Sequence, residues 1–259
     1  MNDGRNLLEV RELSLRFGGV LALDAVSFGV REKQICGLIG PNGAGKSSLF
    51  NCISRLYAPS AGEIYWRSQP LSRLPRHRIA GLGIGRTFQN LALFRAMSVM
   101  DNVRVGTHCR TRAGVLASVF RSRAMRREEA FSAHRADELL RLVGLERWAD
   151  QRADALPFGL QKRIELARAL ASAPTLLLLD EPAAGLNAGE LDALAELVRD
   201  IRRRLDITVL VVEHHMRFLM GISDQVVALN FGRKIAQGSP VQVQNDPAVI
   251  EAYLGAATP

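Results

Sequence analysis

Cysteines are few in this chain of 259 residues, and long apolar runs are absent. Its three cysteines, Cys36, Cys52 and Cys109, are far apart and form no CxxC pair. This argues against a disulfide framework or a zinc site and favours a reducing compartment. We expect Cys36 and Cys52 to be small buried side chains. The longest apolar stretches, Leu176–Leu179 and Ile207–Val212, have the length of strands, whereas a membrane-spanning helix needs about 18–20 apolar residues.

Acidic residues are scarce in one region of the chain. The formal net charge is +8, yet residues 64–127 hold thirteen arginines and a single acid, Asp101. The N-terminal residues carry both positive and negative charges and contain no apolar core, so no secretory signal is expected. The arginine-rich region predicts either a basic surface patch that faces lipid headgroups or nucleic acid, or a solvated helical face.

Strand-like and helical patterns alternate along the rest of the chain. The content of 47% hydrophobic and 23% charged residues is typical of a globular protein. Continuous apolar strands that alternate with helices indicate an α/β fold with crossover connections. The expected strands are Leu7–Leu13, Ala25–Val30, Ile35–Ile39, Thr175–Leu179, Ile207–Val212 and Val226–Leu229, and the expected helices are Lys46–Ser54, Leu160–Ala171, Ala188–Leu205 and His215–Gly221.

The middle and the end of the chain differ from this pattern. From Leu91 to about Ala155 the pattern is helical, which predicts a helical insertion within the α/β core. A short strand at Lys234–Gln237 is followed by a loop and a final helix, Pro247–Leu254, with Asp246 as its N-cap. We therefore expect one domain over residues 1–259, with its core at 1–90 and 156–237, the insertion at 91–155 and a C-terminal extension at 238–259.

A glycine-rich loop follows the predicted strand Ile35–Ile39. Residues 40–47, GPNGAGKS, match the pattern G-x4-G-K-S between a strand and a helix. Backbone N–H groups of such a loop form a nest for phosphates, and the start of the helix adds its positive dipole end. We expect Lys46 to reach the β- and γ-phosphates and the Ser47 hydroxyl to ligate Mg²⁺. Kinases, GTPases, recombinases and transporter motors all share this loop.

Polar side chains follow several of the predicted strands. Asp180 stands at the carboxyl end of a buried strand, where it can ligate Mg²⁺, and Glu181 beside it can orient or deprotonate an attacking water. His214 follows the next strand and can face the γ-phosphate. Gln89 follows the strand-like Ile84–Phe88 and can touch Mg²⁺ or water. Phe17 either stacks on a base or is a core aromatic residue.

Together these motifs resemble the ATP-binding subunit of ABC transporters over essentially the whole chain. The resemblance implies a P-loop NTPase core with a mainly parallel sheet, an N-terminal antiparallel β portion and an inserted α-helical subdomain. It gives Phe17 the role of the adenine-stacking aromatic, Gln89 that of the Q-loop and His214 that of the switch histidine. It makes Asp180 and Glu181 the end of the Walker B motif. The implied nucleotide-binding residues of the Walker A loop are Gly40, Pro41, Asn42, Gly43, Ala44, Gly45, Lys46, Ser47 and Ser48.

The signature loop of that family falls at residues 156–160, where the usual form is LSGGQ. Leu156 and Gly159 match, whereas Pro157 replaces Ser, Phe158 replaces Gly and Leu160 replaces Gln. The resemblance implies that this loop caps the γ-phosphate of ATP held by the opposite subunit. Gly159 and the start of a helix near Leu160 can do so through backbone N–H groups.

Three segments are similar to the longer ATPase subunit of branched-chain amino acid uptake systems: EPAAGLN at 181–187, VVEHHMRFLMGISD at 211–224 and DPAVIEAYLG at 246–255. His215 stands where Asp is usual. The likeness implies an ATP-hydrolysing importer motor that uses ATP and Mg²⁺ at the cytoplasmic face of the plasma membrane. It also implies a dimer with itself or a paralogue, transmembrane permease subunits and, indirectly, a solute-binding protein. Urea and short-amide importers have similar motors.

Two other functions account for part of the sequence. A nucleic-acid-associated ABC ATPase would explain the arginine-rich region. Against it, the chain has one nucleotide-binding unit, no long coiled coil and few aromatic residues among those arginines to stack on bases. A small-molecule kinase would explain the phosphate loop but neither the signature loop nor His214. Under the transporter interpretation, the seven arginines of Arg104–Arg127 face acidic headgroups or acidic loops of the permease.

Overall fold

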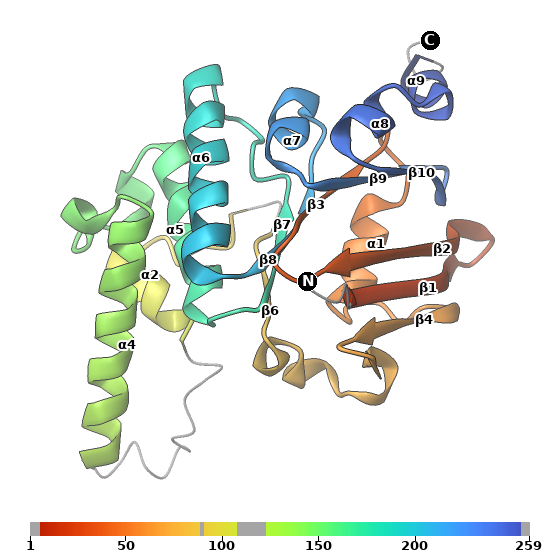
Figure 1. Ribbon diagram of the computed structural model, residues 1–259. Coiled ribbons are helices and arrows are strands. Elements are labelled where there is room, and N and C mark those ends of the chain that lie inside the picture. Colours follow the sequence, from red (N-terminus) through yellow and green to blue (C-terminus); the bar gives the residue numbers. More distant parts are fainter. Residues whose placement is uncertain (1–5, 89–90, 108–122, 255–259) are drawn as a thin grey trace, which may run out of the picture. The chain divides into compact units, whose positions relative to one another are not determined.

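The computed structural model describes residues 6–88, 91–107 and 123–254 (Figure 1). The described residues divide into two compact units, one within 1–79 and 178–259 and the other within 80–177. Two residues singled out from the sequence, Gln89 and Cys109, lie outside the described residues. So does the part of the arginine-rich region between 108 and 122.

An antiparallel sheet forms the N-terminal part of the first unit. Its strands are β1 (Asn6–Phe17), β2 (Val20–Arg31), β4 (Ala61–Trp66) and β5 (Gln69–Pro70), in the order β2-β1-β4-β5. Figure 1 shows β2, β1 and β4 side by side. The predicted strands at 7–13 and 25–30 lie within β1 and β2, and both strands extend beyond the predicted bounds. Strand β4 was not predicted, because its short run of mixed polar and aromatic residues carries a weak apolar pattern, and neither was the two-residue strand β5.

The second sheet contains the buried parallel strands. Its order is β10-β9-β3-β8-β7-β6, and β3 runs parallel to both β8 and β9, whereas β10 is antiparallel to β9. Every residue of β3, β7 and β8 is buried, as their continuous apolar sequences predict. The bounds are β3 (Ile35–Ile39), β6 (Ile84–Arg86), β7 (Leu176–Asp180), β8 (Thr208–Val212), β9 (Gln225–Asn230) and β10 (Arg233–Gly238).

The described part of the first unit also contains the α-helices α1 (Lys46–Ile53), α6 (Ala188–Leu205), α7 (Met216–Ile222), α8 (Pro240–Gln244) and α9 (Pro247–Leu254), and short 3-10 helices at Leu71–Arg73 and Arg76–Arg78. The predicted N-cap of α9 is confirmed, because Asp246 Oδ1 accepts the N–H of Ala248 over 2.9 Å. The loop predicted before α9 is wrong, since residues 240–244 form α8. Ser239 caps this helix and Pro240 occupies its first turn. Five residues are too few to show a helical period.

The second unit is mainly helical. It contains α2 (Val99–Val105), α4 (Arg123–Leu142) and α5 (Phe158–Ala171), with β6 beside the first residues of β7. The described residues between 91 and 155 form helices, turns and one isolated bridge, Ser98 with Arg152, so the helical character of this stretch is confirmed. Within the described ranges, no helix combines the length and apolar content that crossing a bilayer requires.

Candidate functional site

The glycine-rich loop joins the end of β3 to the start of α1 and packs closely on its surroundings. A Cβ on Gly40 would lie 2.3 Å from the carbonyl oxygen of Leu229, and one on Gly45 would lie 2.7 Å from that of Ala22. Both residues also have positive φ, +152° and +101°. Only glycine fits these positions, so the loop takes a backbone path in which its N–H groups can turn toward a phosphate.

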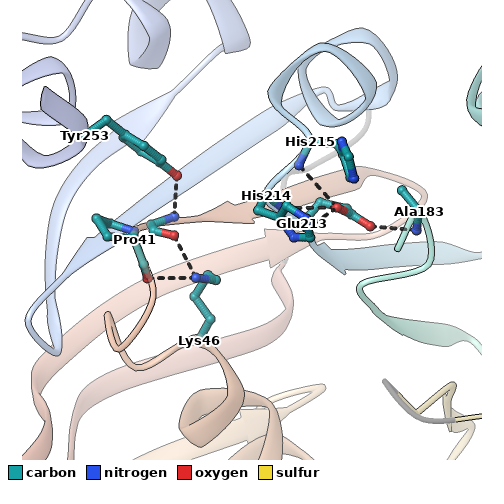
Figure 2. A network of polar contacts seen from close by, with 8 residues as sticks. Pro41, Lys46, Ala183, Glu213, His214, His215 and Tyr253 are labelled. Atoms are coloured by element: carbon teal, nitrogen blue, oxygen red, sulfur yellow. Dashed lines mark hydrogen bonds and ion pairs between the residues drawn. The ribbon is translucent and has the colours of Figure 1, made fainter. Parts of the chain in front are cut away.

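Lys46 lies folded over this loop. Its Nζ donates hydrogen bonds to the carbonyl oxygens of Gly40, at 2.6 Å, and Pro41, at 2.9 Å (Figure 2). Burial lowers the pKa of Lys46, while the negative charge of Glu181 opposes that shift. A buried cation held beside a loop of backbone N–H groups is suited to bind an anionic ligand such as a polyphosphate.

The acidic pair stands at the end of β7. Asp180 is buried, and the N–H of Glu181 donates to the carbonyl oxygen of Val212 over 3.0 Å. The carboxyl ends of β7 and β8 therefore lie side by side. Glu181 has a φ of +48°, in the left-handed region that costs a residue with a side chain about 1–2 kcal/mol. Backbone strain of this kind gathers at functional sites, and the negative charge of Glu181 acts on Lys46 of the phosphate loop.

Glu213, which sequence analysis missed, connects this edge to the histidine that follows β8. Its side chain is fully buried. Oε1 accepts the N–H of Ala183 at 2.7 Å, and Oε2 accepts those of His214 at 3.0 Å and His215 at 3.3 Å (Figure 2). One carboxylate thus fixes the segment after Glu181 and the segment of His214 together. The available signal was an acid placed directly after a strand that is apolar at every position but Thr208.

His214 projects from this anchored segment and is exposed. Its Nδ1 lies 3.8 Å from Glu213 Oε2, and its ring centroid lies 4.5 Å from that of His215. Glu213, His214 and His215 could offer a metal three ligand atoms within 4.8 Å of one another. Both oxygens of Glu213 already accept backbone N–H groups, so we assign the carboxylate to positioning His214. For Mg²⁺, the hydroxyl of Ser47 in the first turn of α1 and the carboxylate of Asp180 at a strand end are ligands of the right chemistry.

Phe17, the last residue of β1, is 46% exposed. Its ring meets that of Tyr57 edge to face, with centroids 5.2 Å apart. The interpretation of Phe17 as a core aromatic residue is therefore wrong. The Phe17 ring is partly open to solvent, as stacking on a nucleotide base requires.

We expect the Phe17→Ala variant to bind ATP about tenfold more weakly, because stacking on an aromatic side chain contributes roughly 1–3 kcal/mol per base. Phe17→Trp should retain the affinity, and inorganic tripolyphosphate should bind to all three chains alike. Titration calorimetry measures these affinities, with Phe131→Ala as the control for loss of an exposed phenylalanine. A matching loss of tripolyphosphate binding would contradict a role in base stacking.

The signature loop belongs to the second unit. Leu156 is buried, and its carbonyl oxygen accepts a hydrogen bond from Gln161 Nε2 at 2.8 Å. The exposed ring of Phe158 lies 5.6 Å from Lys162 Nζ. Helix α5 begins at Phe158, two residues before the predicted start, because the carbonyl of Pro157 accepts the N–H groups of Leu160 and Gln161. Gly159 thus lies in a first turn, where helical geometry leaves N–H groups available to an anion.

The residue before Gln89 is held by a buried acid of the same unit. Glu165 Oε1 accepts the N–H of Phe88 over 3.0 Å, and burial raises the pKa of Glu165. The carboxylate of Glu165 therefore holds the backbone of Phe88 in place.

A phosphate loop on β3 and an acidic pair on β7, two strands of one sheet, define the nucleotide-binding core of a P-loop ATPase. Residues 23–184 match the family model of the ABC transporter, and residues 233–258 match that of the branched-chain amino acid ATP-binding cassette transporter. The chain belongs to the ABC transporter family of ATP-binding proteins, and the predicted family resemblance is confirmed.

Curated relatives and solved structures agree with this membership over nearly the full length. The chain is 43% identical to the high-affinity branched-chain amino acid transport ATP-binding protein LivG of Salmonella typhimurium, over 97% of this chain and 98% of LivG. It is also 43% identical to BraF of Pseudomonas aeruginosa, over 98% and 99%. The crystal structure of the ABC transporter cassette MJ1267 in its ADP conformation superposes with a TM-score of 0.84 at 29% identity, covering 97% and 99%. The predicted P-loop NTPase fold is therefore confirmed.

Proposed function

We propose that this chain is the ATP-hydrolysing motor subunit of an ABC importer for branched-chain amino acids. The observation that carries the proposal is the similarity to LivG and BraF over nearly the whole of all three chains. It is supported by a match of residues 233–258 to the C-terminal model of branched-chain amino acid cassettes. The geometry of the phosphate loop and the acidic pair supports the ATPase activity itself.

Each candidate site residue has a distinct part in hydrolysis. Backbone N–H groups of the phosphate loop and the Lys46 ammonium bind the phosphates, and Phe17 stacks on the adenine. Glu181 accepts the proton of the attacking water, and His214 contacts the γ-phosphate. Gln89 senses the nucleotide. Ser47, Asp180 and Gln89 would hold Mg²⁺, which neutralises charge on the phosphates when bound.

A second ATPase subunit completes the proposed site. The signature loop, residues 156–160, contacts the γ-phosphate of ATP bound to the opposite subunit, with Gly159 donating its backbone N–H. Pro157 and Leu160 offer no hydroxyl or amide there, so backbone donors carry this contact. The second subunit is another copy of this chain or a paralogue.

The motor acts on a separate membrane protein. In this proposal, permease subunits form the pathway through the membrane, and the ATPase binds to their cytoplasmic face. A solute-binding protein delivers the amino acid to the permease, without contact with this chain. The domain organisation proposed for the motor is a core at 1–90 and 156–237, an insertion at 91–155 that receives the permease, and an extension at 238–259.

Deletion of the gene tests this function. We expect ATP-dependent uptake of labelled leucine into cells to be lost and then restored by the wild-type chain but not by Lys46→Ala. Loss of urea or short-amide uptake with normal leucine uptake would assign the motor to another importer. A tagged chain should co-purify with membrane proteins. Recovery of DNA or RNA in their place would overturn the transporter proposal in favour of a nucleic-acid-associated ATPase.

A further inference from the structure

The C-terminal helix α9 reaches the first residue of the phosphate loop. The hydroxyl of Tyr253 accepts the N–H of Gly40 over 2.9 Å, a contact between residues 213 positions apart (Figure 2). Gly40 is buried. A buried backbone N–H needs a hydrogen-bond partner, and the end of the chain supplies it.

The phosphate loop is held at its start and near its end by hydrogen bonds, some of them from groups outside its own motif. At its start, Gly40 donates to Tyr253 and accepts a hydrogen bond from Lys46. Near its end, the carbonyl oxygen of Ala44 accepts the N–H of Gly232 over 3.1 Å, from the turn between β9 and β10. Two of these contacts therefore come from the last 28 residues of the chain, Gly232 to Pro259, which the Walker motifs do not include.

We propose that Tyr253 is a positioning residue for ATP, because its hydroxyl holds the first peptide group of the phosphate loop in the nucleotide-binding conformation before ATP arrives. A preorganised loop avoids an ordering cost when the ligand binds. Without the hydroxyl, the N–H of Gly40 loses its partner and the loop relaxes to satisfy it. ATP must then restore the original conformation, so its affinity falls. This inference rests on the proposed ATP-binding function.

Tyr253 is well suited to this role. Asp246 and the buried side chain of Val249 fix the start of helix α9. The backbone that carries the ring of Tyr253 is therefore held in place. Burial raises the pKa of Tyr253, and the hydrogen bond from Gly40 opposes that shift. The hydroxyl is therefore neutral at physiological pH, and its acceptor role is constant over the range in which the ATPase would work.

The test compares Tyr253→Phe with the wild-type chain. Phenylalanine keeps the ring and its packing and removes only the hydroxyl. We expect the Kd for ATP to rise about five- to tenfold, as loss of one hydrogen bond to a buried group predicts. In ATPase assays KM should rise while kcat stays unchanged, since the contact acts on binding. Tyr65→Phe in β4 is the matched control and should leave both constants unchanged.

Hydrogen exchange of residues 248–254 provides a second readout on the wild-type chain. Because coupling between two sites is reciprocal, ATP should slow exchange in α9, and Tyr253→Phe should remove this protection. A Kd within about twofold of wild type, even with a lower Tm, would show that Tyr253 only packs the helix. Equal protection of α9 in both chains would also overturn the proposal. Failure of the wild-type chain to bind ATP would instead refute the proposed function.

Discussion

The Glu181→Gln variant should bind ATP with wild-type affinity and hydrolyse it about 10²–10⁴-fold more slowly, the range that a positioned general base contributes. Glutamine has nearly the same size and can adopt the same strained backbone at a φ of +48°. It still orients water through its amide oxygen, but it cannot take the proton. The loss therefore falls on kcat and leaves the Kd for ATP unchanged.

Two measurements separate this outcome from general damage. Calorimetry gives the Kd for ATP, and size-exclusion chromatography detects an ATP-bound dimer that accumulates because hydrolysis no longer opens it. Glu196→Gln, which neutralises an exposed acid on α6, is the matched control and should retain full turnover. Near-normal hydrolysis by Glu181→Gln would remove Glu181 from the role of base.

The local sequence was sufficient to predict the strands and helices that position the candidate site. Strand β3 and helix α6 have the bounds that the sequence predicts, because β3 is apolar at nearly every position and α6 begins with an Asn187–Glu190 capping box. The phosphate loop could be recognised for a related reason. Its glycines are required by the local backbone conformation and by close packing. No other residue type fits there, so the glycines mark the loop in the sequence.

The contacts that position the site were beyond sequence reasoning. Glu213 binds backbone groups on two segments about 30 residues apart, and Tyr253 binds a loop from the opposite end of the chain. Neither residue belongs to a sequence period or a motif that predicts its hydrogen-bond partner. Such pairs form only when the parallel sheet brings the ends of β3, β7 and β8 to one edge. The strain at Glu181 likewise depends on where β7 ends beside β8, not on the residue itself.

Replacing Lys46 by Ala or Met should weaken ATP binding about 10–100-fold, because a hydrogen bond to a charged group contributes roughly 1.5–3 kcal/mol. Lys46 Nζ is the buried cation over the loop, and its bonds to Gly40 and Pro41 hold it where the phosphates arrive. Lys46→Arg should not restore binding, since the larger planar guanidinium does not fit the place of a compact ammonium. Calorimetric titration with ATP measures the loss, and unchanged affinity would contradict the assignment of the loop.

The stability of the same variants separates binding from folding. Burial lowers the pKa of Lys46, so near neutral pH its charged form destabilises the nucleotide-free chain, and this cost diminishes as pH rises toward the pKa of the unfolded chain. Lys46→Met keeps the length of the side chain and removes the buried charge. It should therefore unfold at a Tm no lower than wild type while losing ATP affinity, whereas Lys234→Met on the exposed face of β10 should change neither. A large fall in Tm for Lys46→Met would show that the lysine supports the fold, because its bonds to the loop carbonyls would then outweigh the cost of burying its charge.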